Sequence, residues 1–262
     1  MRYSRPMPAY EISSPNNEQI KRLVDLRDRR GRDAERLFLV EGARLFSRAI
    51  AFGLEPVEVY YDPQRVDASS HSVAVSTSPK ALERASYRSR SEGLIAVFKQ
   101  MDLSLESLQL PDNPLILIGE GIEKPGNLGA MLRTADAVGA AAFVAVDSRI
   151  DPFNPNAVRA STGALFTVPL ATADFASVDA WLKRSDIRLI AASPDAETDY
   201  WKADLTGPVA ILVGSEADGL SAGATQAADL LVRIPMSGVV DSLNSSVAFA
   251  VLAFETLRQR SV

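Results

Sequence analysis

The chain has 262 residues, of which 47% are hydrophobic and 23% are charged, and its formal net charge is −5. This composition is typical of one or two globular domains and excludes a disordered chain. There is no Cys and one His, His71 in a polar loop, which excludes disulfides, thiolate or multi-histidine metal sites and a convincing Ser-His-Asp triad. No apolar run approaches the ~20 residues of a membrane span, and the N-terminus lacks the apolar core of a signal peptide. A cytoplasmic protein without a metal is predicted.

The positive charge is concentrated near the N-terminus. Residues 1–50 carry eleven Lys and Arg, Arg2 and Arg5 among them, against seven Asp and Glu, and ten of the eleven cations are Arg. Arg is suited to bidentate phosphate contacts, so one interpretation is a phosphate-binding surface. The alternative is a solvated helix with ion pairs four residues apart, Asp25–Arg29 and Asp28–Arg32. The sequence alone leaves both open.

The first hundred residues predict a small α/β domain. Residues 1–16 are polar and contain Pro, which indicates a loosely attached tail. Asn16 or Asn17 can cap a helix with apolar residues at 20, 23, 24 and 26, and Gly31 would end or interrupt it. Short apolar runs predict strands at 37–40, 57–61, 73–75 and 93–98, with one helix around 45–50 and another opening at Pro79.

A second domain is predicted after the weakly periodic, Pro-bearing segment 101–114. Continuous apolar runs predict buried strands at 115–118, 142–146, 165–168, 187–191, 209–213 and 230–234. Helices are expected over 128–138, after Asn154-Pro155, after a cap at Asp174, and from about Ser242 to the C-terminus. This alternation predicts a parallel sheet covered on both faces, with ligands bound beyond the carboxyl ends of the strands. The last helix is apolar on nearly every side, which places it in a core or a subunit interface.

Three polar, Gly-rich loops follow these strand ends, at 119–135, 214–220 and 234–246, and can converge on one pocket. The first loop has neither a dinucleotide fingerprint nor the residues of a phosphate-binding P-loop. Arg133 follows Gly129 by four residues, so a bare glycine surface could leave room for a substrate phosphate below the guanidinium. The simpler interpretation is an exposed Arg and a glycine needed for close packing. Structural roles are favoured for Glu120 and Glu123.

Taken together, these loops resemble the three signature motifs of the TrmH/SpoU family of RNA 2′-O-ribose methyltransferases, in the SPOUT superfamily. The matching segments are Asn127 to Ala135 with Arg133, Leu212 to Ser221 with Glu216, and Ile234 to Ala248 with Ser242 and Asn244. Residues 159–166, including Gly163, match the segment between the first two motifs. The resemblance covers about 113–260. More loosely, residues 29–42 are similar to the family's substrate-binding domain, which resembles ribosomal protein L30e.

The resemblance implies an α/β fold with two domains: residues 1–102 bind RNA and carry the flexible tail, and residues 113–262 form a SPOUT domain with a C-terminal trefoil knot. It implies S-adenosylmethionine held around Leu212, Gly214, Ile234, Met236, Leu243 and Gly163, and a homodimer whose active site the partner completes. Arg27, Arg29, Arg30 and Arg32 would contact RNA, with ribosomal RNA favoured over transfer RNA.

By the same resemblance Arg133 is the central catalytic residue, either fixing a phosphate and stabilising the developing alkoxide or acting as a base. Asn127 and Asn244 would orient Arg133 or the ribose, Glu216 would hold the polar network, and Ser242 would lie near the reacting centre. The competing hypotheses are a non-catalytic RNA-binding dimer of the same fold and a nucleotide-dependent α/β enzyme.

Overall fold

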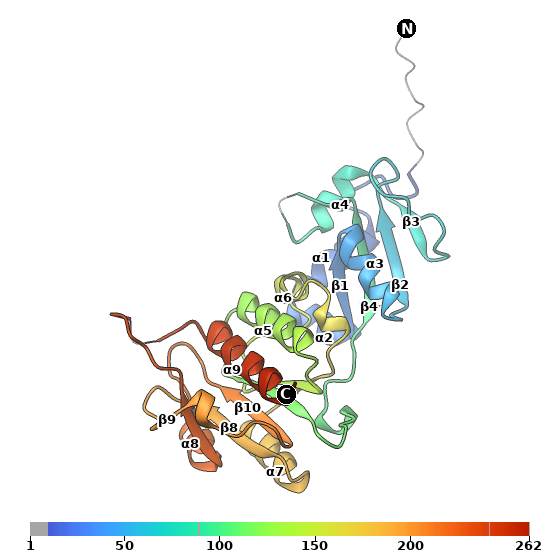
Figure 1. The fold of residues 1–262 in the computed structure, drawn as a ribbon. Coiled ribbons are helices and arrows are strands. Elements are labelled where there is room, and N and C mark those ends of the chain that lie inside the picture. Colours follow the sequence, from blue (N-terminus) through green and yellow to red (C-terminus); the bar gives the residue numbers. More distant parts are fainter. Residues whose placement is uncertain (1–9, 89, 241, 262) are drawn as a thin grey trace. The chain divides into compact units, whose positions relative to one another are not determined.

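The computed structural model describes residues 10–88, 90–240 and 242–261, and the chain divides into two compact units (Figure 1). The first unit runs to Met101 and includes Phe153–Arg159; the second comprises Asp102–Pro152 and Ala160–Val262. Arg2, Arg5 and the expected tail up to residue 9 lie outside the described residues. Among the residues that are described, no helix has the length and apolar character needed to cross a membrane.

The first unit is built on a four-stranded sheet with the order β1-β4-β2-β3. β4 is antiparallel to both of its neighbours, and β3 is parallel to β2. The elements before Met101 are α1 (Glu18–Asp25), α2 (Arg29–Glu35), β1 (Leu37–Glu41), α3 (Ala43–Ala51), β2 (Pro56–Tyr61), β3 (Ala74–Ser76), α4 (Pro79–Ala85) and β4 (Leu94–Lys99).

The start of the first helix follows the expected capping chemistry, but its end does not. The Asn17 side chain accepts a hydrogen bond from the Gln19 amide and caps α1. The helix ends at Asp25, well before Gly31, which lies inside α2. A Cβ at Gly31 would stand 2.2 Å from the carbonyl oxygen of Asp25, so this glycine permits the close approach of α2 to the end of α1.

The expectation of a loose tail is wrong for residues 10–16. Ile12 is buried in the core of the first unit, and its backbone exchanges hydrogen bonds with the carbonyl of Ser76 and the amide of Ser78. The sequence signal was polar composition, but one buried apolar side chain and hydrogen bonds made by the residues on either side of it dock the segment.

The second unit contains a seven-stranded, fully parallel sheet with the order β7-β6-β5-β10-β8-β11-β9. Its elements, with those of the connecting segment, are η1 (Leu105–Ser107), β5 (Leu115–Glu120), α5 (Pro125–Ala137), β6 (Ala142–Val146), η2 (Ala164–Phe166), β7 (Leu170–Ala173), α7 (Phe175–Arg184), β8 (Arg188–Ala192), β9 (Thr198–Asp199), η3 (Tyr200–Lys202), β10 (Val209–Val213), α8 (Ala222–Ala227), β11 (Leu230–Arg233) and α9 (Ser245–Arg260). The helix α6 (Pro155–Ala160) belongs to the first unit except for its last residue.

Helices pack on both faces of this sheet, as the continuous apolar strands predict. Ala210 and Leu212 of β10 join one core cluster with Val178 and Leu182 of α7. α9 packs against α5 and β10, and the Phe249 ring of α9 meets Phe143 of β6 edge-on at a centroid distance of 5.7 Å. Figure 1 shows α5 and α9 side by side and α7 beside α8.

The strand predicted at 165–168 is wrong. Ala164–Phe166 form a short 3-10 turn, and the strand β7 begins at Leu170. Gly163 precedes the turn with a φ of 109°, a left-handed conformation that favours glycine. A short apolar run is compatible with a strand or with a buried turn, and here Leu165 and Phe166 are buried in the turn.

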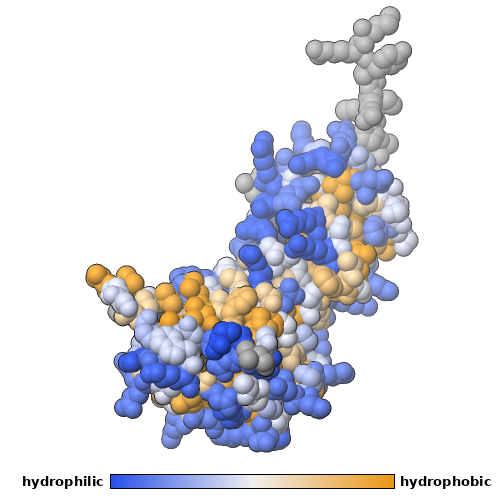
Figure 2. Space-filling view, in the orientation of Figure 1, coloured by the Kyte–Doolittle hydropathy of each residue, from blue (hydrophilic) through white to orange (hydrophobic). Residues whose placement is uncertain are grey.

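The last helix begins at Ser245, three residues after the predicted start, with Asn244 as its cap. Phe249, Leu252 and Ala253 are buried against the sheet, but Val247 and Phe254 are about half exposed. Figure 2 shows hydrophobic surface over α9. The helix is therefore buried on one side only within a single chain.

Candidate active site

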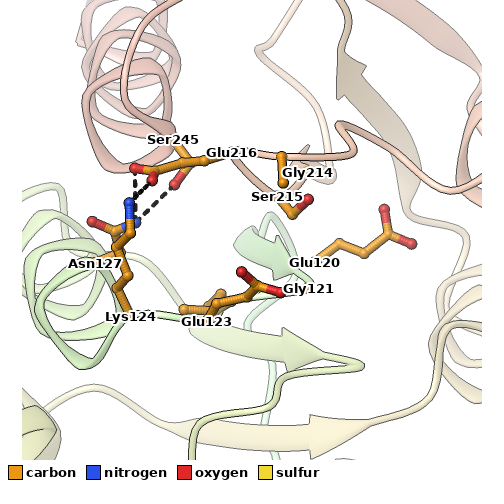
Figure 3. Close-up of a pocket in the computed structure, with 11 residues that line it drawn as sticks. Glu120, Gly121, Glu123, Lys124, Asn127, Gly214, Ser215, Glu216 and Ser245 are labelled. Carbon is orange, nitrogen blue, oxygen red and sulfur yellow. Dashed lines mark hydrogen bonds and ion pairs between the residues drawn. The ribbon is translucent and has the colours of Figure 1, made fainter.

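The loops that follow β5 and β10 and the start of α9 meet at the carboxylate of Glu216 (Figure 3). One carboxylate oxygen accepts hydrogen bonds from the Asn127 amide at 3.0 Å and from the Asn244 amide, and the other pairs with the ammonium of Lys124. The Asn127 amide also lies 3.3 Å from the Ser245 hydroxyl. Asn127, Glu216 and Asn244, far apart in sequence, thus form one polar cluster.

Asn244 reaches this cluster because it caps α9. Its side-chain oxygen accepts hydrogen bonds from the Ser246 amide at 3.0 Å and from the Ser246 hydroxyl at 2.6 Å. The side-chain nitrogen is left to donate to Glu216 and, at 3.4 Å, to the oxygen of Asn127. A cap side chain is held by the helix it starts, so α9 fixes one donor of the cluster.

The cluster keeps Glu216 charged. The hydrogen bond from Lys124 is the largest of the causes that lower the pKa of Glu216, followed by the bond from Asn127, while burial acts in the opposite direction. An ionised carboxylate only accepts hydrogen bonds. Around neutral pH Glu216 is therefore an anion that can orient amides, hydroxyls or cations.

Two cavities adjoin Glu216. The large cavity, of about 350 Å³, lies beyond the carboxyl ends of β8, β10 and β11, and the small cavity, of about 250 Å³, lies between the loops after β5 and β10. Both linings include Gly214, Ser215, Glu216, Ala217 and Ser245. The large cavity is in the size range of small-molecule sites.

The predicted cofactor residues divide between this cavity and the core. Gly214, Ile234, Met236 and Leu243 line the large cavity, together with the predicted catalytic residue Ser242. Leu212 and Gly163 are not among its lining: the Leu212 side chain packs with α7, and Gly163 starts the turn η2.

Sequence reasoning missed one wall of the large cavity, residues 192–194, at the carboxyl end of β8. The strand-end rule could have found them, because β8 ends at the same edge of the parallel sheet. It also missed Lys124, whose position directly before Pro125 and the start of α5 gave no chemical signal.

Gly214 allows the turn that follows β10. A Cβ at this position would lie 2.2 Å from the carbonyl oxygen of Gly219, and Ser215 and Gly219 exchange backbone hydrogen bonds of 3.0 and 3.2 Å. The 214–219 segment therefore folds tightly back on itself and presents Glu216 between the two cavities.

Arg133 does not join the cluster in the single chain. It is exposed on α5, and within the described residues it has neither a hydrogen bond nor an ion pair. Six residues separate it from Asn127, and at 100° per residue the two side chains lie about 120° apart around the helix. The glycine surface proposed below Arg133 is wrong: a Cβ at Gly129 would stand 2.4 Å from the Cβ of Ala160, so Gly129 serves close packing.

The four arginines predicted to bind RNA have different environments. Arg29 and Arg30 are exposed on α2, and Arg29 pairs with Asp33 at 3.4 Å instead of joining the expected pair with Asp25. Arg27 is partly exposed and lies 5.8 Å from the centre of the Tyr87 ring. Arg32 is 1% exposed and donates to the carbonyls of Leu26 and Arg27, at 3.1 and 2.6 Å. The RNA-binding prediction is therefore wrong for Arg32, which ties α2 to the end of α1.

Three other titratable residues that the sequence singled out have structural contacts. Glu120 is buried and accepts a hydrogen bond of 3.0 Å from the Ser221 amide at the start of α8, and Glu123 pairs with Arg149 at 2.6 Å. The His71 ring packs edge-on against Phe46. In the part of the chain that the structure describes, no group of three or more His, Asp or Glu is arranged to hold a metal ion.

Two family models match the chain. The SpoU rRNA Methylase family matches residues 114–254, and the MRM3-like substrate binding domain matches residues 17–96. The first match contains every residue of the Glu216 cluster, and the second contains the sheet of the first unit up to β4.

Relatives and solved structures agree with these matches. The 23S rRNA (guanosine-2′-O-)-methyltransferase RlmB of a Burkholderia species is 35% identical over 241 residues, which are 86% of this chain and 98% of that protein. A crystal structure of an RNA 2′-O ribose methyltransferase is 40% identical, with a TM-score of 0.83 over 96% of this chain and 99% of that one. The SpoU methyltransferase AviRb from Streptomyces viridochromogenes, solved with the cofactor AdoMet, is 27% identical with a TM-score of 0.86 over 94% of this chain and 98% of that one. The chain therefore belongs to the SpoU rRNA methylase family.

Proposed function

We propose that the protein transfers a methyl group from S-adenosylmethionine to a ribose 2′-hydroxyl of ribosomal RNA in the cytoplasm. The observation that carries the proposal is the Glu216 cluster: Asn127, Glu216 and Asn244, one from each motif, meet beside a cavity in a chain of this family. The relative from Burkholderia is named for 2′-O-methylation of guanosine in 23S rRNA, which supports ribosomal RNA as the substrate.

The large cavity fits S-adenosylmethionine. Ile234, Met236 and Leu243 offer apolar surface for an adenine ring, while Glu216 and Asp218 offer negative charge to a sulfonium and an ammonium group. The bound cofactor supplies a methyl group on a positively charged sulfur. The trefoil knot that the family resemblance implies is part of the same proposal. It is supported by the loops after β10 and β11, which both line this cavity.

The protein's own residues would orient the acceptor and stabilise its charge. Loss of the 2′-hydroxyl proton develops negative charge on oxygen, and Arg133, which is exposed and unpaired among the described residues, is the cation assigned to stabilise it and to hold the adjoining phosphate. Asn127 and Asn244, fixed by Glu216, would direct their amides at the ribose, and Ser242 would hydrogen-bond near it.

A homodimer is part of the proposal, because Arg133 lies about 120° around α5 from Asn127 and does not contact the cluster of its own chain. The half-exposed apolar side chains of α9, Val247 and Phe254, support an interface with a second copy. In such a dimer Arg133 of one subunit would serve the cluster of the other. Replacing both Val247 and Phe254 with Asp is expected to give monomers by sedimentation analysis and to abolish transfer; a dimer that persists would contradict this interface.

RNA would be held by the first unit, through the exposed Arg29 and Arg30 and the partly exposed Arg27. The match to a substrate binding domain over residues 17–96 supports this role.

The test is transfer of labelled methyl groups to ribosomal RNA from cells that lack the protein, followed by mapping of the 2′-O-methyl position. Arg133→Ala is expected to keep its fold and its cofactor affinity but to lower the transfer rate by about 100-fold or more. Near-normal transfer by this variant would overturn the role of Arg133. A wild-type chain that modifies no ribosomal RNA, or that labels transfer RNA instead, would overturn the proposed substrate.

A further inference from the structure

Lys124 contacts the cluster of Asn127, Glu216 and Asn244 but lies outside the three signature motifs. It is the residue just before α5, and its side chain is 66% exposed, whereas the Glu216 side chain is 25% exposed. Holding so exposed a lysine side chain in place costs rotamer entropy. Here the ammonium group is directed at one carboxylate, the one in the wall shared by both cavities (Figure 3).

The contacts of Glu216 are divided between its two oxygens. Asn127 and Asn244 both donate to Oε1, and Lys124 binds Oε2. With Lys124 removed, no side chain in the described residues would hold Oε2, and the carboxylate would keep only the two amides at Oε1 and a backbone hydrogen bond from Ser245. The side-chain amides of Asn127 and Asn244 would then share an acceptor that is held less firmly.

The charges around Glu216 make Lys124 its main countercharge. Of the other charged groups lining the cavities, Glu123 is paired with Arg149, and Glu120 turns away towards Ser221. Asp218 lines the large cavity and adds negative charge there. Without Lys124, the wall between the cavities would gain one uncompensated negative charge.

We propose that Lys124 is a positioning residue for methyl transfer. It holds the Glu216 carboxylate in place from the side of the small cavity, and it partly neutralises the negative charge that this carboxylate presents to the cofactor. This inference rests on the proposed function. S-adenosylmethionine carries a positive sulfonium, and its product S-adenosylhomocysteine carries a neutral thioether. The balance between Lys124 and Glu216 therefore sets how strongly the site prefers donor over product.

The experiment compares Lys124→Met with wild type, using calorimetric binding of both compounds and steady-state methyl transfer. Loss of the countercharge is expected to raise the preference for S-adenosylmethionine over S-adenosylhomocysteine by about threefold or more. In this variant the less firmly held Glu216 carboxylate is expected to lower kcat about tenfold, with little change in the KM for RNA. Lys124→Arg keeps the charge and is expected to restore both values.

Lys183 provides a matched control. Its side chain is 67% exposed and pairs at 2.8 Å with Asp179, whose side chain is 24% exposed, on α7 and outside both cavities. Lys183→Met should match wild type in every measurement. Glu216→Gln should lower the preference for S-adenosylmethionine, because it leaves the charge of Lys124 uncompensated, and adding Lys124→Met to it should raise that preference again.

An unchanged ligand preference and kcat in folded Lys124→Met would overturn the inference, as would equal losses in Lys124→Met and Lys124→Arg. If wild type binds both compounds but methylates no RNA, the proposed function fails while the ligand preference still decides the role of Lys124. A wild-type chain that binds neither compound would overturn both.

Discussion

Replacing Gly129 with Ala tests whether the first motif is built on close packing. The added Cβ would lie 2.4 Å from the Cβ of Ala160, 2.6 Å from its carbonyl carbon and 2.7 Å from the amide nitrogen of Ser161. Carbon atoms in good contact are about 3.5–4.0 Å apart, so the backbones of α5 and residues 160–161 must separate by about 1 Å. Backbone atoms cannot rotate away as a flexible side chain can.

The net free energy follows from two opposing effects. Overpacking of this kind costs up to about 3 kcal/mol. Ala in place of Gly in a helix returns about 1 kcal/mol. The unfolding free energy of the second unit should therefore fall by about 2 kcal/mol, which lowers its Tm by about 4–8 °C.

The assay is thermal unfolding followed by circular dichroism, with Gly126→Ala as the control. Gly126 lies in the first turn of the same helix, and a Cβ there would meet nothing within 4 Å. Gly126→Ala should melt at the wild-type temperature or slightly above it. If Gly129→Ala melts as high as Gly126→Ala, the close-packing explanation of the motif glycine is wrong.

Three further predictions concern charged side chains. Arg32→Ala should lower the unfolding free energy of the first unit in urea by about 3 kcal/mol, because it removes hydrogen bonds to one buried and one partly buried carbonyl. Arg30→Ala should leave stability unchanged but weaken RNA binding and reduce the slope of log affinity against log salt concentration by about one. If Arg30→Ala lowers stability and Arg32→Ala weakens RNA binding alone, the structural role of Arg32 and the RNA-binding role of Arg30 are wrong. The third prediction follows from the lowered pKa of Glu216. Its contribution to stability is complete above the ordinary value of 4.5 and is lost as pH falls through the lower folded pKa. The Tm difference between wild type and Glu216→Gln should hold above pH 4.5 and shrink in stronger acid, and a difference that grows there would contradict the cluster.

Local chemistry made much of the fold predictable. The apolar runs at 115–118 and 209–213 became central strands because a strand buried on both faces needs apolar residues throughout. Asn17 and Asp174 cap helices as expected, since a cap depends on its own helix. The run at 165–168 failed because a short apolar segment looks the same whether it extends or turns.

The parts that sequence reasoning missed depend on contacts between distant residues. The burial of Arg32 has no sequence signal, because Arg is rarely buried and its partners are backbone carbonyls. The Lys124 contact with Glu216 joins residues far apart in the chain, and only the parallel order of β5 and β10 brings their loops together. The motif resemblance located Asn127, Glu216 and Asn244 but gave no geometry.

The amide of Asn244 has two separate uses, one for each of its polar atoms. Ser, Thr or Asp could also start α9, but a carboxylate in this place would face Glu216 with like charge, and a hydroxyl is too short to replace both ends of the amide. The first turn of α9 and one of the donors to Glu216 consequently depend on the same side chain. Fraying of that turn would remove the Asn244 donor and leave Glu216 with Asn127 and Lys124, so whatever stabilises the turn also completes the set of contacts around the carboxylate.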